Sequence, residues 1–201
     1  MRSPFQMLIL MTGVVCAAGA TGVAADAGFA TRLELQGFGF DIAATNEGSI
    51  NQLTINTSGL TDDADAITLE IDGAVSGAEI DDLDANGFPE IYIYVTSAGS
   101  GSYGSLVSFA VDSTKSLSEI YLPPVAEDSK YSDGYMGHDE FAVVEGTFVQ
   151  RFPLYEITDS NSQPSGLTRQ LQYKLDAGEA GWVLRLDKAV EYQTVRSDEC
   201  P

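Results

Sequence analysis

Short runs of alternating or β-branched residues, separated by turn-forming residues, extend through most of this chain of 201 residues. In the clearest run, Ile91, Ile93 and Val95 would face one side of a strand, and Tyr92 and Tyr94 the other. No window of a dozen residues keeps a convincing helical stripe. The expected strands are 32–40, 52–56, 66–71, 74–80, 90–95, 106–111, 117–121, 140–145, 147–152, 169–175 and 182–186. This spacing predicts an all-β fold: an antiparallel β-sandwich, with a barrel as the alternative, in a single domain.

Turn signals separate these runs. Segments 71–74 (IDGA) and 145–147 (EGT) are typical of hairpin turns. The polar segments 123–130 and 159–166 predict longer surface loops. We find no internal repeat and no domain linker in the sequence.

The first 25 residues are typical of a cleaved secretory signal. Arg2 supplies a positive start, 7–18 form an apolar core, and 23–25 offer small residues for cleavage. The core is shorter than the roughly 20 residues that span a bilayer. Residues 26–201 are therefore expected to form an exported domain without membrane insertion. Cys200 would be its only cysteine, so no intramolecular disulfide is expected, and the role of this thiol is left open.

The net charge of −20 at pH 7 limits the partners that this protein can attract. Such an acidic surface repels nucleic acid and anionic lipid. It attracts basic partners and speeds encounter with them. Simple solubility explains the same charge equally well.

Segment 96–105 (TSAGSGSYGS) follows the clearest expected strand and precedes another. Its glycines accept backbone angles that other residues avoid, so it predicts a tight turn or a protruding loop. A loop of small residues with one aromatic, held on a rigid sheet, suits insertion into a narrow cleft. Its serine and tyrosine hydroxyls can hydrogen-bond to carboxylates. The alternative is an ordinary solvent-exposed hairpin loop.

A second candidate site is a calcium loop at 82–90. Oxygen-bearing side chains alternate at Asp82, Asp84 and Asn86, and Glu90 follows at the end of the segment. An EF-hand would require a carboxylate at position 93, where the chain has Ile93. A shorter calcium loop and a plain acidic turn are both consistent with this pattern.

Catalytic patterns are weak in this chain. His138 is the only histidine, so the usual zinc set is excluded, although His138 could act as a general base. No serine or cysteine stands in a recognisable nucleophile motif. With 30 acidic residues, some carboxylate pair always resembles that of a glycosidase. We therefore expect no enzyme and no cofactor.

Four longer strings carry a resemblance to a known family: 91–106 (IYIYVTSAGSGSYGSL), 117–124 (LSEIYLPP), 134–141 (GYMGHDEF) and 181–186 (GWVLRL). Through them the chain closely resembles the periplasmic inhibitors of invertebrate-type (i-type) lysozymes, from about residue 33 to residue 192. The family implies an antiparallel β-sandwich in the periplasm of a Gram-negative bacterium. It also implies evasion of host defence, by protecting bacterial peptidoglycan from host lysozyme, and association as a homodimer.

The resemblance also implies which residues bind the enzyme. Related inhibitors carry a Ser-Gly-x-Tyr loop that enters the active-site cleft, and here this motif is Ser100, Gly101, Ser102 and Tyr103. Ser100 and Tyr103 would hydrogen-bond to the catalytic carboxylates. The neighbouring glycines would let the backbone enter and turn: Gly99, Gly101 and Gly104.

Overall fold

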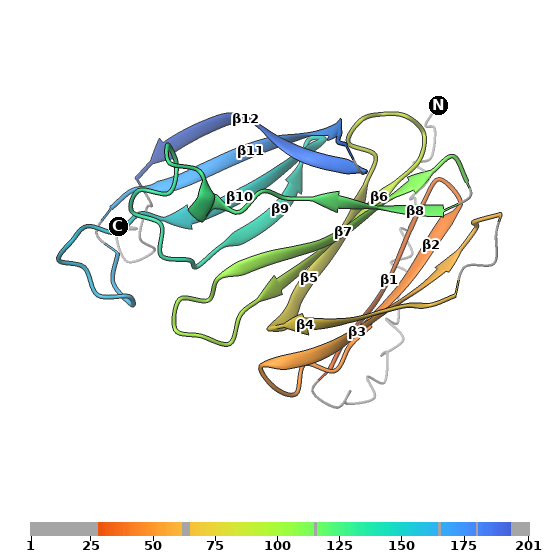
Figure 1. The fold of residues 1–201 in the computed structure, drawn as a ribbon, viewed down its shortest axis with the longest axis horizontal. Helices are drawn as coiled ribbons and strands as arrows, with labels where there is room; N and C mark the ends of the chain where they lie inside the picture. The colour runs from red at the N-terminus through yellow and green to blue at the C-terminus, as the bar shows by residue number, and fades with distance from the viewer. Residues whose placement is uncertain (1–27, 62–64, 115, 165, 180, 194–201) are drawn as a thin grey trace, which may run out of the picture.

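The computed structural model describes residues 28–61, 65–114, 116–164, 166–179 and 181–193. The expected signal segment 1–25 and Cys200 lie outside the described residues. The described chain is all-β, which confirms the fold class predicted by the alternating pattern (Figure 1). Its elements are β1 (Phe29–Leu35), β2 (Phe38–Ala44), β3 (Ile50–Ser58), β4 (Ile67–Asp72), β5 (Ala74–Asp81), β6 (Glu90–Thr96), β7 (Gly104–Asp112), β8 (Ser116–Tyr121), the 3-10 helix η1 (Val125–Glu127), β9 (Glu140–Val144), β10 (Thr147–Pro153), β11 (Thr168–Ala177) and β12 (Trp182–Tyr192). No described segment forms a helix long and apolar enough to cross a membrane.

The strands form two sheets, a four-stranded one in the order β1-β2-β3-β4 and an eight-stranded one in the order β5-β6-β7-β8-β12-β11-β10-β9. Neighbours pair antiparallel, except β8 and β12, which pair in parallel. The eight-stranded sheet curls until its edges β5 and β9 meet. There, Glu79 Oε2 accepts hydrogen bonds from the Tyr94 hydroxyl at 2.6 Å and from the Val143 backbone N–H at 2.5 Å. The four-stranded sheet packs on this barrel-like sheet to form a sandwich.

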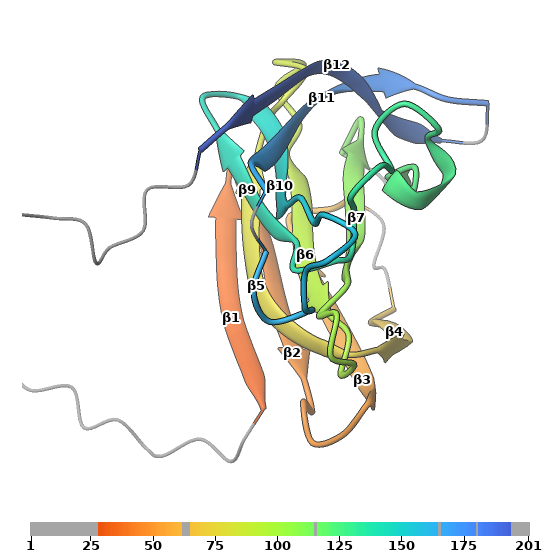
Figure 2. The same ribbon diagram turned by 90° about the vertical axis from the view of Figure 1, so that its left-hand side faces the viewer.

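Strand β6 contributes to both hydrophobic cores of the molecule. Ile91, Ile93 and Val95 face the core between the four-stranded sheet and the β5–β8 strands, as the alternation predicts. Tyr92 and Tyr94 face the core inside the curl, where the Tyr92 ring centroid lies 5.3 Å from that of Phe148 on β10. Figure 2 shows β1–β3 alongside β5–β7, with β11 and β12 crossing over one end. Because β6 is buried on both faces, it gives a fixed base to the loop that follows it.

The expectation of one strand over 32–40 is wrong. The chain reverses at Gln36 and Gly37, whose φ angles are 54° and 88°, and β1 pairs with β2 across this two-residue turn. Apolar residues alternate up to the turn, so the period alone gives no sign of the reversal. Each of the other expected runs overlaps one strand of the structure, from β3 to β12.

The expected hairpin at 71–74 is also wrong, because β4 and β5 belong to different sheets. The chain crosses between the sheets at Gly73, whose φ is +125° and whose missing side chain leaves room for the backbone carbonyl of Thr96. Only glycine fits both requirements. The hairpin at 145–147 is confirmed, since Glu145 and Gly146 have φ angles of 50° and 68° between β9 and β10.

Candidate functional site

Residues 97–103 form a compact loop between β6 and β7. The Ser97 backbone N–H donates to the Tyr103 carbonyl at 2.9 Å, and the Tyr103 N–H donates to Ser97 Oγ at 2.9 Å. A further turn is closed by Ser102 N–H donating to the Gly99 carbonyl at 3.0 Å. These bonds leave 98–100 exposed at the tip. The loop predicted from the sequence therefore has a defined shape.

Two other segments brace this loop. The His138 backbone N–H donates to the Gly101 carbonyl at 2.7 Å, and Asn161 Nδ2 donates to the Ser100 carbonyl. The His138 ring joins the two bracing segments, because its Nε2 lies 3.1 Å from the Asn161 carbonyl oxygen. The same ring stacks on Tyr155 at 6.1 Å between centroids. The contacts of His138 thus tie loops together, which fits the structural role that is usual for a lone histidine near a turn and was the alternative to a general base.

The side chains of Ser100 and Tyr103 face solvent. Ser100 is exposed, and Tyr103 is 47% exposed. The Tyr103 ring meets the Tyr135 ring edge to face at 5.6 Å, which fixes its direction without using its hydroxyl. Among the described residues, neither hydroxyl makes a hydrogen bond within the protein, so both are available to a partner.

The glycines of the loop provide space and no unusual backbone angle. None of Gly99, Gly101 and Gly104 has a positive φ, and the left-handed residue is Ser102, with a φ of 43°. A Cβ on Gly101 would overlap the Tyr103 ring, and one on Gly104 would lie 2.6 Å from the Cβ of Asp139. Gly99 faces open space. Gly101 and Gly104 therefore allow close packing at the base of the loop, and Gly99 does not.

We expect Gly101→Ala to lower the free energy of unfolding by about 1–3 kcal/mol, because the added methyl group must displace the Tyr103 ring. Gly99→Ala is the matched control, expected to change stability by at most about 0.5–1 kcal/mol. Urea unfolding of both variants measures the difference. Equal stabilities would contradict the close packing of Gly101.

Asp139 is the centre of a hydrogen-bond network beneath the loop. Its Oδ2 accepts from the Gly104 N–H at 2.7 Å and from the Tyr135 hydroxyl at 2.7 Å, and its Oδ1 accepts from Gln150 Nε2 at 2.7 Å. Gln150 Oε1 in turn accepts from the Tyr173 hydroxyl at 3.0 Å. Burial raises the pKa of Asp139, while these hydrogen bonds oppose the rise. Asp139 could not be recognised from the sequence, because one acid among 30 carries no visible sign of burial.

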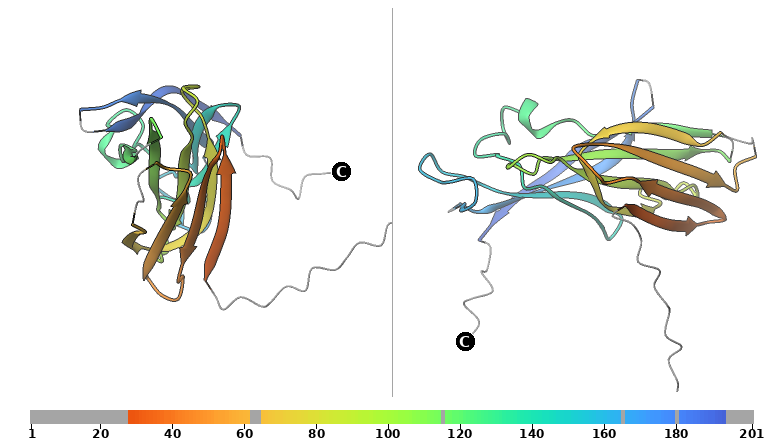
Figure 3. Two further views of the ribbon diagram at one scale, coloured as in Figure 1. Left: turned by 90° about the vertical axis from the view of Figure 1, so that its right-hand side faces the viewer. Right: turned by 90° about the horizontal axis from the view of Figure 1, so that it is seen from below.

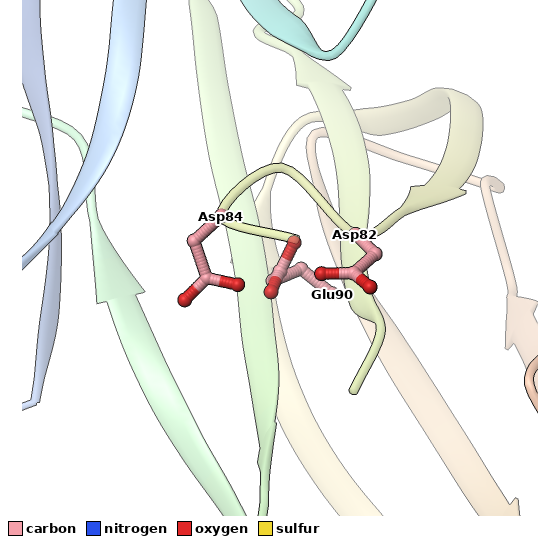
Figure 4. Close-up of side chains that lie close together, drawn as sticks. All are labelled: Asp82, Asp84 and Glu90. Atoms are coloured by element: carbon pink, nitrogen blue, oxygen red, sulfur yellow. The ribbon is translucent and has the colours of Figure 1, made fainter. Parts of the chain in front are cut away.

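The structure brings together three of the four residues expected to bind calcium. Carboxylate oxygens of Asp82, Asp84 and Glu90 lie within 4.8 Å of one another (Figure 4). Glu90 is only 1% exposed, and its Oε2 accepts from the Leu83 N–H at 2.8 Å and the Tyr92 hydroxyl at 3.4 Å. Burial, and then the charges of the two aspartates, raise the pKa of Glu90 to about 8. A cation at this point would favour the ionised form of Glu90.

Asn86, the fourth residue expected to bind calcium, is hydrogen-bonded to this group. Its Oδ1 accepts from the Phe88 N–H at 2.7 Å, and its Nδ2 donates to Asp84 Oδ2 at 2.9 Å. Asp82 also accepts local hydrogen bonds, from the Gly87 N–H at 3.0 Å and from Gln36 Nε2 at 2.6 Å. The two aspartates thus already stabilise the turn without an ion.

The fold and the site define an all-β protein that presents two free hydroxyls on a braced loop. No family model, no curated protein and no solved structure matches this chain.

Proposed function

We propose that this protein is an inhibitor of i-type lysozyme that inserts the 97–103 loop into the active-site cleft of the enzyme. The observation that carries the proposal is the exposure of the Ser100 and Tyr103 hydroxyls on a loop braced by His138 and Asn161. Such a loop meets its target with little ordering cost, because the bracing hydrogen bonds are already made in the free protein. The Ser-Gly-x-Tyr motif supports the same reading.

The chemistry of the cleft suits two neutral hydroxyls. A lysozyme works with a carboxylic acid and a carboxylate, and Ser100 and Tyr103 would hydrogen-bond to them without bringing in a second negative charge. Hydrogen bonds to charged groups contribute roughly 1.5–3 kcal/mol each, whereas nanomolar binding requires about 12 kcal/mol. A wider contact surface must therefore supply the rest. The protein inhibits by occlusion, and no bond is made or broken.

The net charge of −20 supports steering of a basic lysozyme towards the loop. In this proposal the protein acts in the periplasm of a Gram-negative bacterium and protects peptidoglycan there. A homodimer is compatible with the mechanism if it leaves the 97–103 loops of both copies free.

Ser100→Ala and Tyr103→Ala are each expected to weaken inhibition at least about tenfold, which corresponds to about 1.4 kcal/mol. The readout is lysis of a peptidoglycan suspension by an i-type lysozyme, with a chicken-type enzyme in parallel. Matched controls are Ser105→Ala on β7 and Tyr121→Ala on β8, which remove exposed side chains outside the loop. Unaltered inhibition in both loop variants would exclude the loop mechanism.

A calcium-dependent binding module is the second candidate function, favoured by the convergence of Asp82, Asp84 and Glu90. Carboxylate oxygens are the ligands that calcium prefers, and binding would release the proton that the buried Glu90 holds at neutral pH.

This candidate predicts that millimolar calcium raises the melting temperature at pH 8 relative to chelator. Glu90→Gln should abolish the increase, because the amide lacks the charge that the ion would pair with. A melting temperature indifferent to calcium and chelator would exclude the module.

A further inference from the structure

Ile157 is an exposed aliphatic residue in the 156–163 segment, at the end of the molecule that carries the 97–103 loop. Its side chain is fully exposed, at 105% of the reference value. It lies in a turn closed by the Asp159 N–H donating to the Glu156 carbonyl at 3.0 Å, and the Glu156 N–H donates to Asp159 Oδ2 at 2.8 Å. One exposed aliphatic residue needs no explanation by itself. Ile157 becomes a candidate contact residue because its segment is hydrogen-bonded to the 97–103 loop.

The segment around Ile157 is joined to the 97–103 loop. Asn161, four residues further on, donates to the Ser100 carbonyl through Nδ2 and accepts from the Tyr155 hydroxyl at 2.9 Å through its own carbonyl. Figures 1 and 3 show this blue segment extending from the same end as the β6–β7 loop. The segment that carries Ile157 is therefore joined to the Ser100 tip through Asn161, and we refer to the exposed parts of 97–103, 134–139 and 156–163 together as one surface.

Two more exposed apolar side chains belong to this surface. Tyr103 is 47% and Met136 is 38% exposed, and the Met136 carbonyl lies beside Gly101. Segments 97–103, 134–139 and 156–163 contain no lysine and no arginine, whereas Glu156 is exposed directly next to Ile157. Apolar anchors with acidic neighbours complement a partner with apolar depressions and a basic rim.

We propose that Ile157 is a second anchor of the inhibitor, which packs into an apolar depression on the basic rim of the lysozyme cleft while Ser100 and Tyr103 occupy the cleft. This inference rests on the proposed function. It names one residue of the wider contact surface that must supply the binding free energy beyond the two hydrogen bonds of Ser100 and Tyr103. A few anchor side chains that fill desolvated pockets of the partner carry most of the binding energy of protein interfaces.

The test compares inhibition constants for an i-type lysozyme with five proteins: wild type, Ile157→Ala, Ile157→Lys, Tyr103→Ala and the control Val144→Ala. Val144 is 41% exposed on β9, next to the β9–β10 turn, and serves as the matched aliphatic residue. We expect a loss of about fivefold to tenfold for Ile157→Ala, none for Val144→Ala and a larger, salt-sensitive loss for Ile157→Lys.

The outcomes separate the two proposals. Inhibition that depends on Tyr103 and is unchanged in both Ile157 variants overturns the second anchor and leaves the proposed function standing. An equal loss in Val144→Ala also overturns it, because the effect would then not be local. Absence of inhibition by the wild-type protein overturns the proposed function and the anchor with it. Since Ile157 is fully exposed, its variants are expected to keep the wild-type melting temperature, which checks folding directly.

Discussion

Asp139→Ala is expected to lower the free energy of unfolding by about 3–5 kcal/mol and, under the proposed function, to abolish lysozyme inhibition. The substitution leaves three donors beneath the loop without their acceptor: the Gly104 N–H, the Tyr135 hydroxyl and Gln150 Nε2. It also frees the Tyr135 ring, which holds Tyr103 edge to face. Urea unfolding gives the loss of stability, and the peptidoglycan lysis assay gives the loss of inhibition.

Asp139→Asn distinguishes the contribution of the hydrogen bonds from that of the negative charge, because it removes the charge and can keep the hydrogen bonds. The amide oxygen can accept from Gly104 and Tyr135, and a flip of the Gln150 amide lets it accept from the new NH₂ group. The cost should then be only about 1–2 kcal/mol, with inhibition largely kept. If Asp139→Ala were as stable and as inhibitory as the wild type, this network would have no part in positioning the loop.

Glu90→Gln is expected to make the protein more stable than the wild type at pH 8, by up to about 4 kcal/mol in the presence of chelator. The pKa of Glu90 is about 8 in the folded protein, against an ordinary value of 4.5. Between these values the folded state keeps a proton that the unfolded chain has lost. The wild type therefore loses stability as the pH rises through this window. Glutamine has no proton to lose, and its oxygen can still accept from Leu83 and Tyr92.

The measurement is chemical unfolding of wild type and Glu90→Gln at several pH values from 4 to 9. The difference between the two proteins isolates Glu90, because they share every other acid. We expect it to be small near pH 4, to grow up to pH 8 and to level off above. A constant difference across the range would contradict the raised pKa of Glu90.

The fold class and most strands could be predicted because burial on a sheet leaves a period of two in the sequence. The run 90–95 shows this most clearly, since the aliphatic residues on one face of β6 pack in one core and the tyrosines on the other face pack in the second core. The prediction of one strand over 32–40 was wrong because the Gln36–Gly37 turn does not interrupt the alternation. The predicted hairpin at 71–74 was wrong for another reason, because a glycine after an aspartate, as at Gly73, is equally suited to a hairpin and to a crossing between sheets.

The candidate site was only partly predictable. The tip residues Ser100 and Tyr103 are visible in the sequence, because a loop rich in glycine and serine between two strands is a local pattern. The bracing residues are not, since Asp139 and Asn161 lie far along the chain and meet the loop only through tertiary contacts. Gly99 and Gly101 also look alike in the sequence, and only the structure shows that Gly101 packs against the Tyr103 ring whereas Gly99 faces open space.

The sequence by itself determined the all-β class, the positions of most strands, the acidic charge and the small-residue loop with its single aromatic. These properties depend on local period and composition, which a sequence records directly. Only the tertiary structure decided that the large sheet curls, that β6 is buried on both faces, and that Asp139 holds the base of the loop. It also decided that Glu90 is buried beside Asp82 and Asp84. Burial and hydrogen bonding between distant segments set these features, because both depend on which surfaces meet after the chain has folded.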